Sequence, residues 1–182
     1  MSETNNIQFS GVKVGETFKI GDMEFIRFSE QNGMTPVVMK EIPFRSRFGN
    51  NNDFRASTVL KKLQEDILPR IIEVVGEENV CEFEIDLTTL DGLKPYEPLK
   101  SRISLPTLDF YRANAEIFGK YKPGSWWWLA TPDSAEPNDS PYWVLCVSPA
   151  GNINNGSCYN DDGGVRPFLI LKSSIFDSCE EQ

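Results

Sequence analysis

Three consecutive tryptophans, Trp126, Trp127 and Trp128, stand in the segment GSWWWLATP of a chain that has four tryptophans in all. Neighbouring side chains of a β-strand point to opposite faces, so Trp126 and Trp128 share one face and Trp127 has the other. Large apolar groups on both faces are typical of a strand buried between two layers. The run therefore predicts a buried central strand, and Trp127 is the tryptophan we would choose if one of the three were functional. We also expect structural roles for Trp143 and for Arg166, which should pair with a carboxylate or stack on a ring.

The first third of the chain predicts strands followed by one clear helix. Residues 16–30, ETFKIGDMEFIRFSE, alternate apolar and polar residues around a Gly-Asp turn, which is typical of a hairpin, and a further strand runs through residues 37–39. From Ser57 onward apolar residues recur every three or four positions, so a helix begins there. Pro69 is expected to end or kink it, leaving two helices or one bent helix up to Gly76.

An acidic strand, a second helix and a β-rich end are expected in the rest of the chain. Residues 80–87, VCEFEIDL, alternate apolar with acidic side chains, which predicts a half-exposed strand with a negative outer face. The second helix is expected over residues 104–118, with Pro106 in its first turn. Short apolar runs follow, separated by turn-forming residues, and Asn155-Gly156 predicts a hairpin turn.

This order of elements predicts an α+β fold with a mixed or antiparallel sheet, two helices and a loop-rich C-terminal β region. A length of 182 residues favours a single domain. Its expected parts are the N-terminal strands with the first helix (8–75), the acidic strand with the second helix (76–122), the β-rich region (123–172) and an acidic tail (173–182).

The chain contains no histidine, and this excludes several kinds of catalytic site. Ser-His-Asp and Cys-His nucleophile systems and histidine-bearing zinc sites all require that residue. The sequence also has no glycine-rich phosphate-binding motif. We therefore expect no enzymatic activity, no cofactor and no metal. Calcium stays open as an alternative, because PDSAEPNDSP and YNDDGG, which begin at Pro132 and Tyr159, place carboxylate and amide oxygens on loops.

Acidic residues outnumber basic ones by 27 to 18, for a formal charge of −9. Residues 40–70 are themselves basic, with seven bases and four acids, so the rest of the chain carries the acidic excess. This balance argues against direct binding of a nucleic acid and suits a basic partner, such as a nucleic-acid-binding protein. The alternative is that the acidity only keeps the protein dispersed. The candidate partner-binding residues are Glu82, Glu84, Asp86, Asp133, Glu136, Asp139, Asp161 and Asp162.

Neither a signal peptide nor an apolar run of eighteen residues is found in the sequence. The four cysteines, Cys81, Cys146, Cys158 and Cys179, form no CxxC pair. We therefore expect a cytoplasmic protein with free thiols. Whether Cys146 and Cys158 lie close enough to bond is left open, because spacing alone does not decide disulfide geometry.

The segments WWWLATP, YWVLCVSPAGNI and GVRPFLIL, within residues 125–171, resemble a bacterial and phage domain of unknown function that reads WWLRSP, a V-x-x-x-G strand and GVRPAL. That family is similar to the C-type-lectin-like fold, which formylglycine-generating enzymes and variable receptor-binding proteins of phages also resemble. The resemblance implies paired N- and C-terminal strands, two helices and a loop-rich variable surface. Ala130 stands where the family has arginine, and the paired cysteines of formylglycine-generating enzymes have no counterpart, so their oxidase activity is not carried over.

The acidity and the resemblance together lead to one principal hypothesis, a non-enzymatic protein-binding module of phage or mobile-element origin. We expect a diffusible inhibitor, in the cytoplasm of the bacterial host, of a basic nucleic-acid-binding protein such as a CRISPR-Cas nuclease, as anti-CRISPR proteins are. The alternatives are a lectin-like ligand- or receptor-binding domain, with or without calcium, and a structural component of a phage particle.

Overall fold

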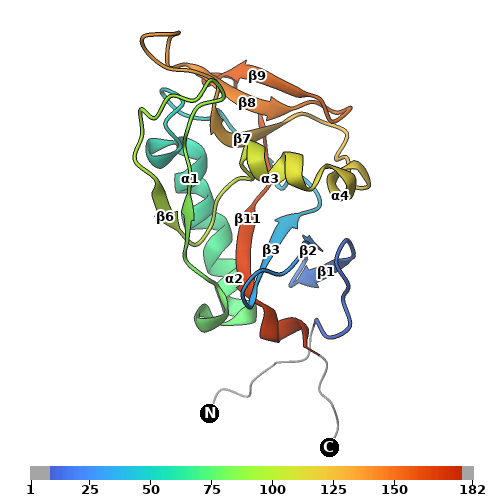
Figure 1. Cartoon of the computed structure of the whole chain (residues 1–182). Helices are drawn as coiled ribbons and strands as arrows, with labels where there is room; N and C mark the ends of the chain where they lie inside the picture. The colour runs from blue at the N-terminus through green and yellow to red at the C-terminus, as the bar shows by residue number, and fades with distance from the viewer. Residues whose placement is uncertain (1–8, 178–182) are drawn as a thin grey trace, which may run out of the picture.

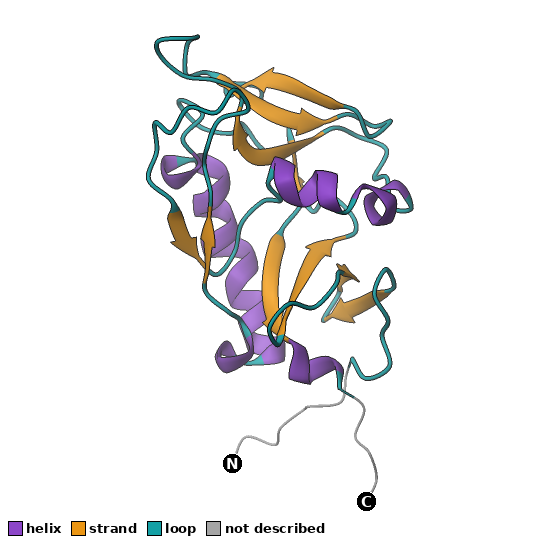
Figure 2. Cartoon of the chain, viewed as in Figure 1, coloured by secondary structure: helices purple, strands orange, loops and turns teal. Residues whose placement is uncertain are grey.

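Three sheets and one main helix make up residues 9–177, the part of the chain that the computed structural model describes. The main helix runs along one side, and the sheet that contains the tryptophans lies above the sheet formed by the N-terminal strands (Figure 1). Figure 2 shows how strands and short helices share the rest of the chain. The α+β class and the mixed sheet expected from the sequence are confirmed.

A four-stranded antiparallel sheet joins the beginning and the end of the described chain. Its strands are β1 (Thr17–Ile20), β2 (Met23–Arg27), β3 (Met34–Met39) and β11 (Phe168–Lys172), in the order β1-β2-β3-β11. Ile20 pairs with Met23 across the turn, so the expected hairpin is confirmed. Because β11 pairs with β3, this sheet agrees with the paired N- and C-terminal strands that the resemblance implied.

The tryptophan strand is the middle strand of a five-stranded sheet. The strands are β4 (Phe44–Arg45), β10 (Gly164–Val165), β7 (Trp127–Pro132), β8 (Trp143–Val147) and β9 (Ile153–Ser157), in the order β4-β10-β7-β8-β9. Only the β10–β7 pair is parallel, and all six residues of β7 are buried. The register of β7 against β8 shifts between Trp128 and Pro132, and the strand bends there (Figure 2). The buried central strand is thus confirmed.

Trp127 and Trp128 belong to two different hydrophobic clusters, one on each face of β7. Trp128 packs with Phe48, at 5.6 Å between ring centroids, whereas Trp127 packs with Tyr111 at 5.7 Å. Trp126 is half-buried and meets Trp128 edge-on at 4.7 Å. Trp143, for which a structural role is also predicted, is the first residue of β8, and 39% of its surface is exposed.

The main helix continues through Pro69, so of the outcomes left open there a single helix is the one observed, and the helix does not end at this residue. It consists of α1 (Thr58–Lys62), a π-helical turn (Leu63–Ile67) and α2 (Leu68–Val75). The Ser57 hydroxyl caps its start by accepting from the Leu60 N–H at 2.9 Å. In the π-turn the Leu68 N–H donates to the Leu63 carbonyl, five residues earlier, so the wider turn accommodates a residue that has no N–H.

The second helix begins later than expected, so its predicted start at residue 104 is wrong, and two short helices take its place. Ser104 is extended and exchanges backbone hydrogen bonds with Phe168, at 2.9 and 2.8 Å, so helix formation begins only after Thr107. The helices are α3 (Leu108–Ala113) and α4 (Ala115–Gly119), separated by Asn114, which has φ −122° and ψ 23°. Short 3₁₀ turns occupy Phe54–Ala56, Glu77–Asn79 and Ser173–Phe176.

The acidic segment forms a shorter strand than expected. A two-stranded sheet joins β5 (Phe83–Ile85) to β6 (Leu99–Ser101). The alternation continues beyond the strand, so Glu82, Glu84 and Asp86 are exposed. The negative outer face is therefore present although only three residues pair as a strand.

Asn155 and Gly156 lie inside β9 and form no turn, which corrects the expected hairpin turn. The chain reverses earlier, where the Ser148 N–H donates to the Asn152 carbonyl at 2.8 Å. A β-carbon on Gly156 would lie 3.2 Å from the Trp128 ring. The close packing of the Trp128 ring against this backbone therefore favours glycine at position 156.

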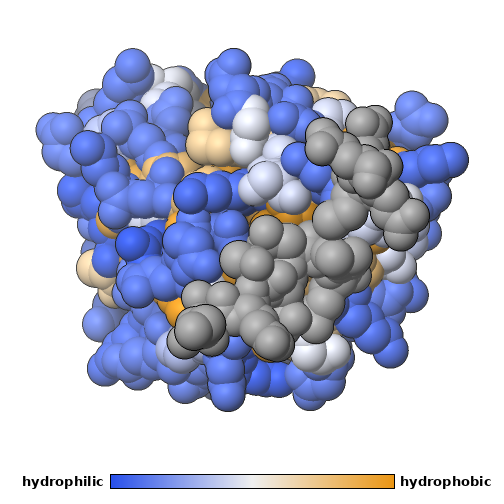
Figure 3. Space-filling model, turned by 90° about the horizontal axis from the view of Figure 1, so that it is seen from below, coloured by the Kyte–Doolittle hydropathy of each residue, from blue (hydrophilic) through white to orange (hydrophobic). Residues whose placement is uncertain are grey.

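Cys81, Cys146 and Cys158 carry free thiols, and Cys179 lies outside the described residues. Within residues 9–177, no helix has both the length and the apolar character needed to cross a membrane. Seen from below, the surface is mainly hydrophilic, with hydrophobic residues showing in the gaps (Figure 3).

Candidate functional site

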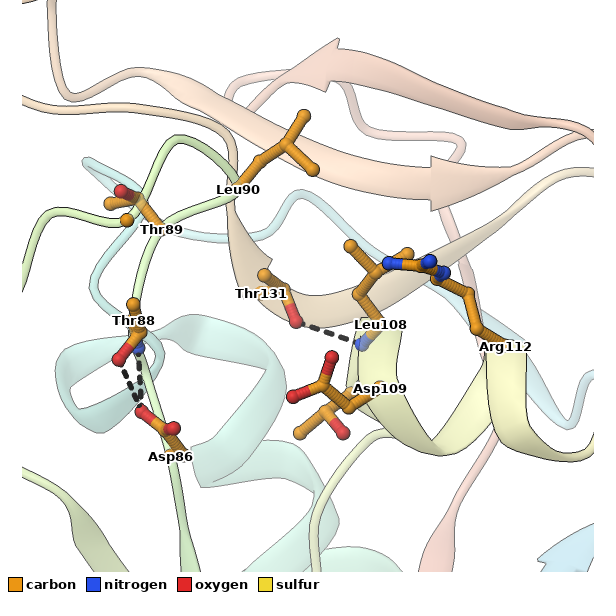
Figure 4. A pocket seen from close by; sticks show the side chains of 10 residues that line it. Asp86, Thr88, Thr89, Leu90, Leu108, Asp109, Arg112 and Thr131 are labelled. Atoms are coloured by element: carbon orange, nitrogen blue, oxygen red, sulfur yellow. Dashed lines mark hydrogen bonds between the residues drawn. The ribbon is translucent and has the colours of Figure 1, made fainter.

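Two adjoining cavities run between the acidic strand and α3, and we call them together the acidic cleft. The polar cavity has a volume of about 290 Å³ and lies among the residue 86–92 loop, the start of α3 and β7 (Figure 4). The apolar cavity has a volume of about 240 Å³ and shares Asp86 and Thr107 with the first. Asp86, one of the predicted partner-binding residues, therefore stands where the two cavities meet.

Hydrogen bonds fix the polar cavity on both sides. The Asp86 carboxylate accepts from the Thr88 hydroxyl at 2.6 Å and from the Thr88 N–H at 2.9 Å, and these bonds lower the pKa of Asp86 (Figure 4). On the other side, the Thr131 hydroxyl accepts from the Leu108 N–H at 2.9 Å, which ties α3 to β7. Asp86 is therefore a fixed, ionised hydrogen-bond acceptor at neutral pH.

Asp109 and Arg112 complete the polar cavity from α3. Figure 4 shows the Asp109 carboxylate beside Thr131, and the Arg112 guanidinium above Leu108. Within residues 9–177 neither side chain forms a salt bridge. Two carboxylates and one guanidinium are thus available to a ligand, and the arrangement suits a group that carries positive charge and hydrogen-bond donors.

Aromatic rings form the wall of the apolar cavity. Phe168 meets Phe83 at 5.3 Å and Phe110 at 4.9 Å, both edge-to-face. Ile85 and Ile170 also line this cavity, and Glu84 stands at it from the acidic strand. The cleft therefore offers an apolar pocket beside a negatively charged rim.

Asp91 links the cleft to the loop that carries three more of the predicted acids. Its carboxylate accepts from the hydroxyls of Ser134 and Thr89, both at 2.6 Å, and from the Asn138 amide at 2.9 Å. The residue 86–93 loop is thereby bound to the residue 133–139 loop. The structure thus connects the loop of Asp133, Glu136 and Asp139 with the loop that follows Asp86.

Asn52 holds the other side of the residue 133–139 loop. Its buried amide donates to the Ser134 carbonyl at 2.8 Å and to the Trp143 carbonyl at 3.0 Å, while its oxygen accepts from the Tyr96 hydroxyl. Asn52 and Asp91 are the residues that sequence reasoning missed. The only sequence signal was that Asp91 is one of several acids in an acidic segment.

Asp161 and Asp162 lie outside the acidic cleft. Asp162 lines a separate cavity that also contains Trp126, and its carbonyl accepts from Arg45 at 3.3 Å. Within residues 9–177 no group of three or more histidine, cysteine, aspartate or glutamate side chains is arranged to hold a metal ion. Asn138 belongs to the segment considered for calcium, and its side-chain N–H donates a hydrogen bond to the Asp91 carboxylate.

The hydrogen bonds to the Asp91 carboxylate predict that this group titrates at an unusually low pH. The hydroxyl of Ser134, followed by Thr89 and Asn138, lowers the pKa of Asp91 to about 2. The native pKa is below the ordinary value of about 3.9, so ionised Asp91 stabilises the fold above about pH 4, and this contribution is lost as the pH falls towards 2. Carbon-detected NMR should show Asp91 still ionised at about pH 3, and Ser134→Ala should raise its midpoint. A midpoint of about 3.9 in the unaltered protein would contradict the loop contact.

A family comparison matches residues 101–173 to a domain of unknown function (DUF6273). The match contains α3 and the strands β7 to β11, whereas Asp86 and β5 lie before it. Two other comparisons, with curated proteins and with solved structures, found no match to the chain.

Proposed function

We propose that this protein is a non-enzymatic protein-binding module that binds a basic, nucleic-acid-binding partner through the acidic cleft. The observation that carries the proposal is the position of Glu82, Glu84 and Asp86, exposed on one face of the acidic strand beside an apolar cavity. Negative charge on a rim steers a basic partner during encounter, and an apolar pocket gives an anchor for one of its side chains. The formal charge of −9 adds a long-range attraction for such a partner.

We further propose that the partner is a nuclease of a bacterial defence system, and that this protein inhibits it in the bacterial cytoplasm. A nuclease that binds nucleic acid has the basic surface that the acidic cleft complements. The proposed fold class is C-type-lectin-like. Support for this comes from the sequence resemblance, from the sheet shared by the N-terminal hairpin and β11, and from the long loop between β7 and β8.

Charge reversal on the acidic strand tests this function. The variant Glu82→Lys/Glu84→Lys/Asp86→Lys should bind the partner about tenfold or more weakly, because attraction at the rim becomes repulsion. Purified CRISPR-Cas nucleases of several types serve as the probes, with inhibition of DNA cleavage and affinity at two salt concentrations as the measurements. The affinity of the unaltered protein should fall as salt rises.

A matched control comes from the main helix. Glu65→Lys/Asp66→Lys/Glu73→Lys makes the same change in charge at three exposed positions and should leave binding within about twofold of the unaltered protein. Equal loss in both triple variants would show that net charge alone acts and would remove the cleft as the site. If no nuclease in the panel is inhibited, the proposed class of partner is wrong.

A further inference from the structure

A larger cavity, of about 400 Å³, lies away from the acidic cleft. It is open to solvent and is lined by the residue before β7, by β8 and β9 with the residues that follow β8, and by the loop between β9 and β10. We call it the amide pocket and define it by Trp126, Ser148, Asn154, Asn160 and Asp162. Its volume lies within the range of small-molecule sites, roughly 300–1,000 Å³.

Unused hydrogen-bonding groups face this pocket. Asn155, which also lines it, donates its amide to Asp133 at 3.0 Å. By contrast, no hydrogen bond to another residue of the described chain occupies the side chains of Asn154, Asn160 or Asp162. Two amides and one carboxylate are therefore free to bind a ligand, and together they both donate and accept hydrogen bonds.

Trp126 is held as a fixed aromatic surface at the pocket. Its ring packs edge-on against Trp128, at 4.7 Å and an interplanar angle of 83°. Trp128 is fully buried and donates its indole N–H to the Ser46 carbonyl at 2.9 Å. Gly163 lies so close to the Trp128 ring that a β-carbon there would clash, so the residue 158–163 loop also rests on this ring. The aromatic surface and the polar groups are thus supported by the same buried side chain.

The charges around the pocket select among classes of ligand. Among the residues that the structure describes, no lysine or arginine lines it, and Asp162 would repel an anion such as phosphate. It has one carboxylate, and within residues 9–177 no metal-binding group of three such side chains occurs. A neutral ligand rich in hydroxyl groups fits, because each hydroxyl can donate to one of these groups and accept from another.

We propose that the amide pocket binds the ring of a neutral monosaccharide without a divalent cation. Asn154, Asn160 and Asp162 hydrogen-bond its hydroxyl groups, and the Trp126 ring packs against its C–H groups. Within residues 9–177 the pocket shares no lining residue with the acidic cleft, so the proposal stands independently of the protein-binding function.

Two-dimensional ¹H–¹⁵N NMR tests the proposal on the whole chain. The probes are glucose, galactose, mannose, N-acetylglucosamine and N-acetylgalactosamine, each titrated at millimolar concentration in the presence of EDTA. At least one should shift the Trp126 indole signal and the side-chain amide signals of Asn154 and Asn160 in a saturable way. Asn160→Ala and Asp162→Asn should each weaken that binding by about three- to tenfold, the loss expected for one hydrogen-bonding group.

Asn152→Ala is the matched control, because this exposed asparagine precedes β9 and does not line the pocket. It should leave binding unchanged, and its spectrum and those of the two pocket variants report whether each remains folded. The proposal is overturned if none of the five sugars gives a saturable shift. It is also overturned if Asn160→Ala and Asp162→Asn bind as tightly as the unaltered protein, or if binding appears only when calcium replaces EDTA.

Discussion

Replacing Trp128 with alanine should lower the free energy of unfolding by about 3–5 kcal/mol, the cost of removing a large buried aromatic side chain and leaving a cavity. Trp128 is completely buried, contacts the rings of Phe48 and Trp126, and donates to the Ser46 carbonyl. A domain is typically stable by only about 5–15 kcal/mol, so the loss is a large share of the total. Urea unfolding followed by circular dichroism measures it.

Two further variants separate the causes of this loss. Trp143→Ala is the matched control, since Trp143 is 39% exposed, and it should cost less than about 1 kcal/mol. Trp128→Phe keeps a ring but leaves the Ser46 carbonyl without its donor, so it should cost roughly 1–3 kcal/mol. Equal losses in Trp128→Ala and Trp143→Ala would contradict the placement of β7 as the central buried strand.

Local periodicity predicted those parts of the fold whose cause is local. The alternation around residues 126–128 placed two tryptophans on one face and one on the other, and the recurrence of apolar residues from Ser57 onward marked the start of the main helix. The failures have long-range or compensating causes. Asn155-Gly156 has the chemistry of a turn, yet the close approach of the Trp128 ring favours glycine within the strand. At Pro69 the sequence left open whether the helix ends or continues, and the π-turn that absorbs the missing N–H decides for a continuous helix.

The candidate sites likewise contain residues that local pattern predicted and residues that only long-range contacts bring in. The alternation of acidic and apolar residues was enough to place Glu82, Glu84 and Asp86 together. The role of Asp91 depends on a loop more than forty residues later in the chain, and local pattern carries no trace of that contact. The carboxylates drew attention to Asp161 and Asp162, whereas the amide pocket also depends on asparagines that resemble ordinary turn residues in sequence.

Arg166, the residue after β10, is a buried polar side chain that connects the end of β3 with the segment that follows α4. It is 1% exposed, and its guanidinium lies 4.8 Å from the Trp127 ring centroid and 5.6 Å from that of Phe118. The stacking alternative of the sequence prediction is thus the one observed, and within residues 9–177 Arg166 forms no salt bridge. Burial lowers the pKa of Arg166 to about 10, which leaves the group charged at neutral pH.

Arg166→Met should therefore lower the free energy of unfolding by about 3 kcal/mol or more, although it removes a buried charge. The guanidinium donates to the carbonyls of Met39 at 3.0 Å, Lys40 at 2.9 Å and Tyr121 at 3.1 Å, and methionine leaves all three without that donor. An unpaired buried carbonyl such as that of Met39 costs about 1–3 kcal/mol, the part-buried carbonyls of Lys40 and Tyr121 add less each, and removing a desolvated cation offsets part of the sum. Arg166→Lys should restore little of the lost stability, because an ammonium on a flexible stem does not reproduce the planar fork that spans three carbonyls.

The control in urea unfolding is Arg70→Met, which removes only an exposed pair with Asp22 and should cost less than about 1 kcal/mol. Equal stability of Arg166→Met and the unaltered protein would contradict the dependence of these three carbonyls on the guanidinium.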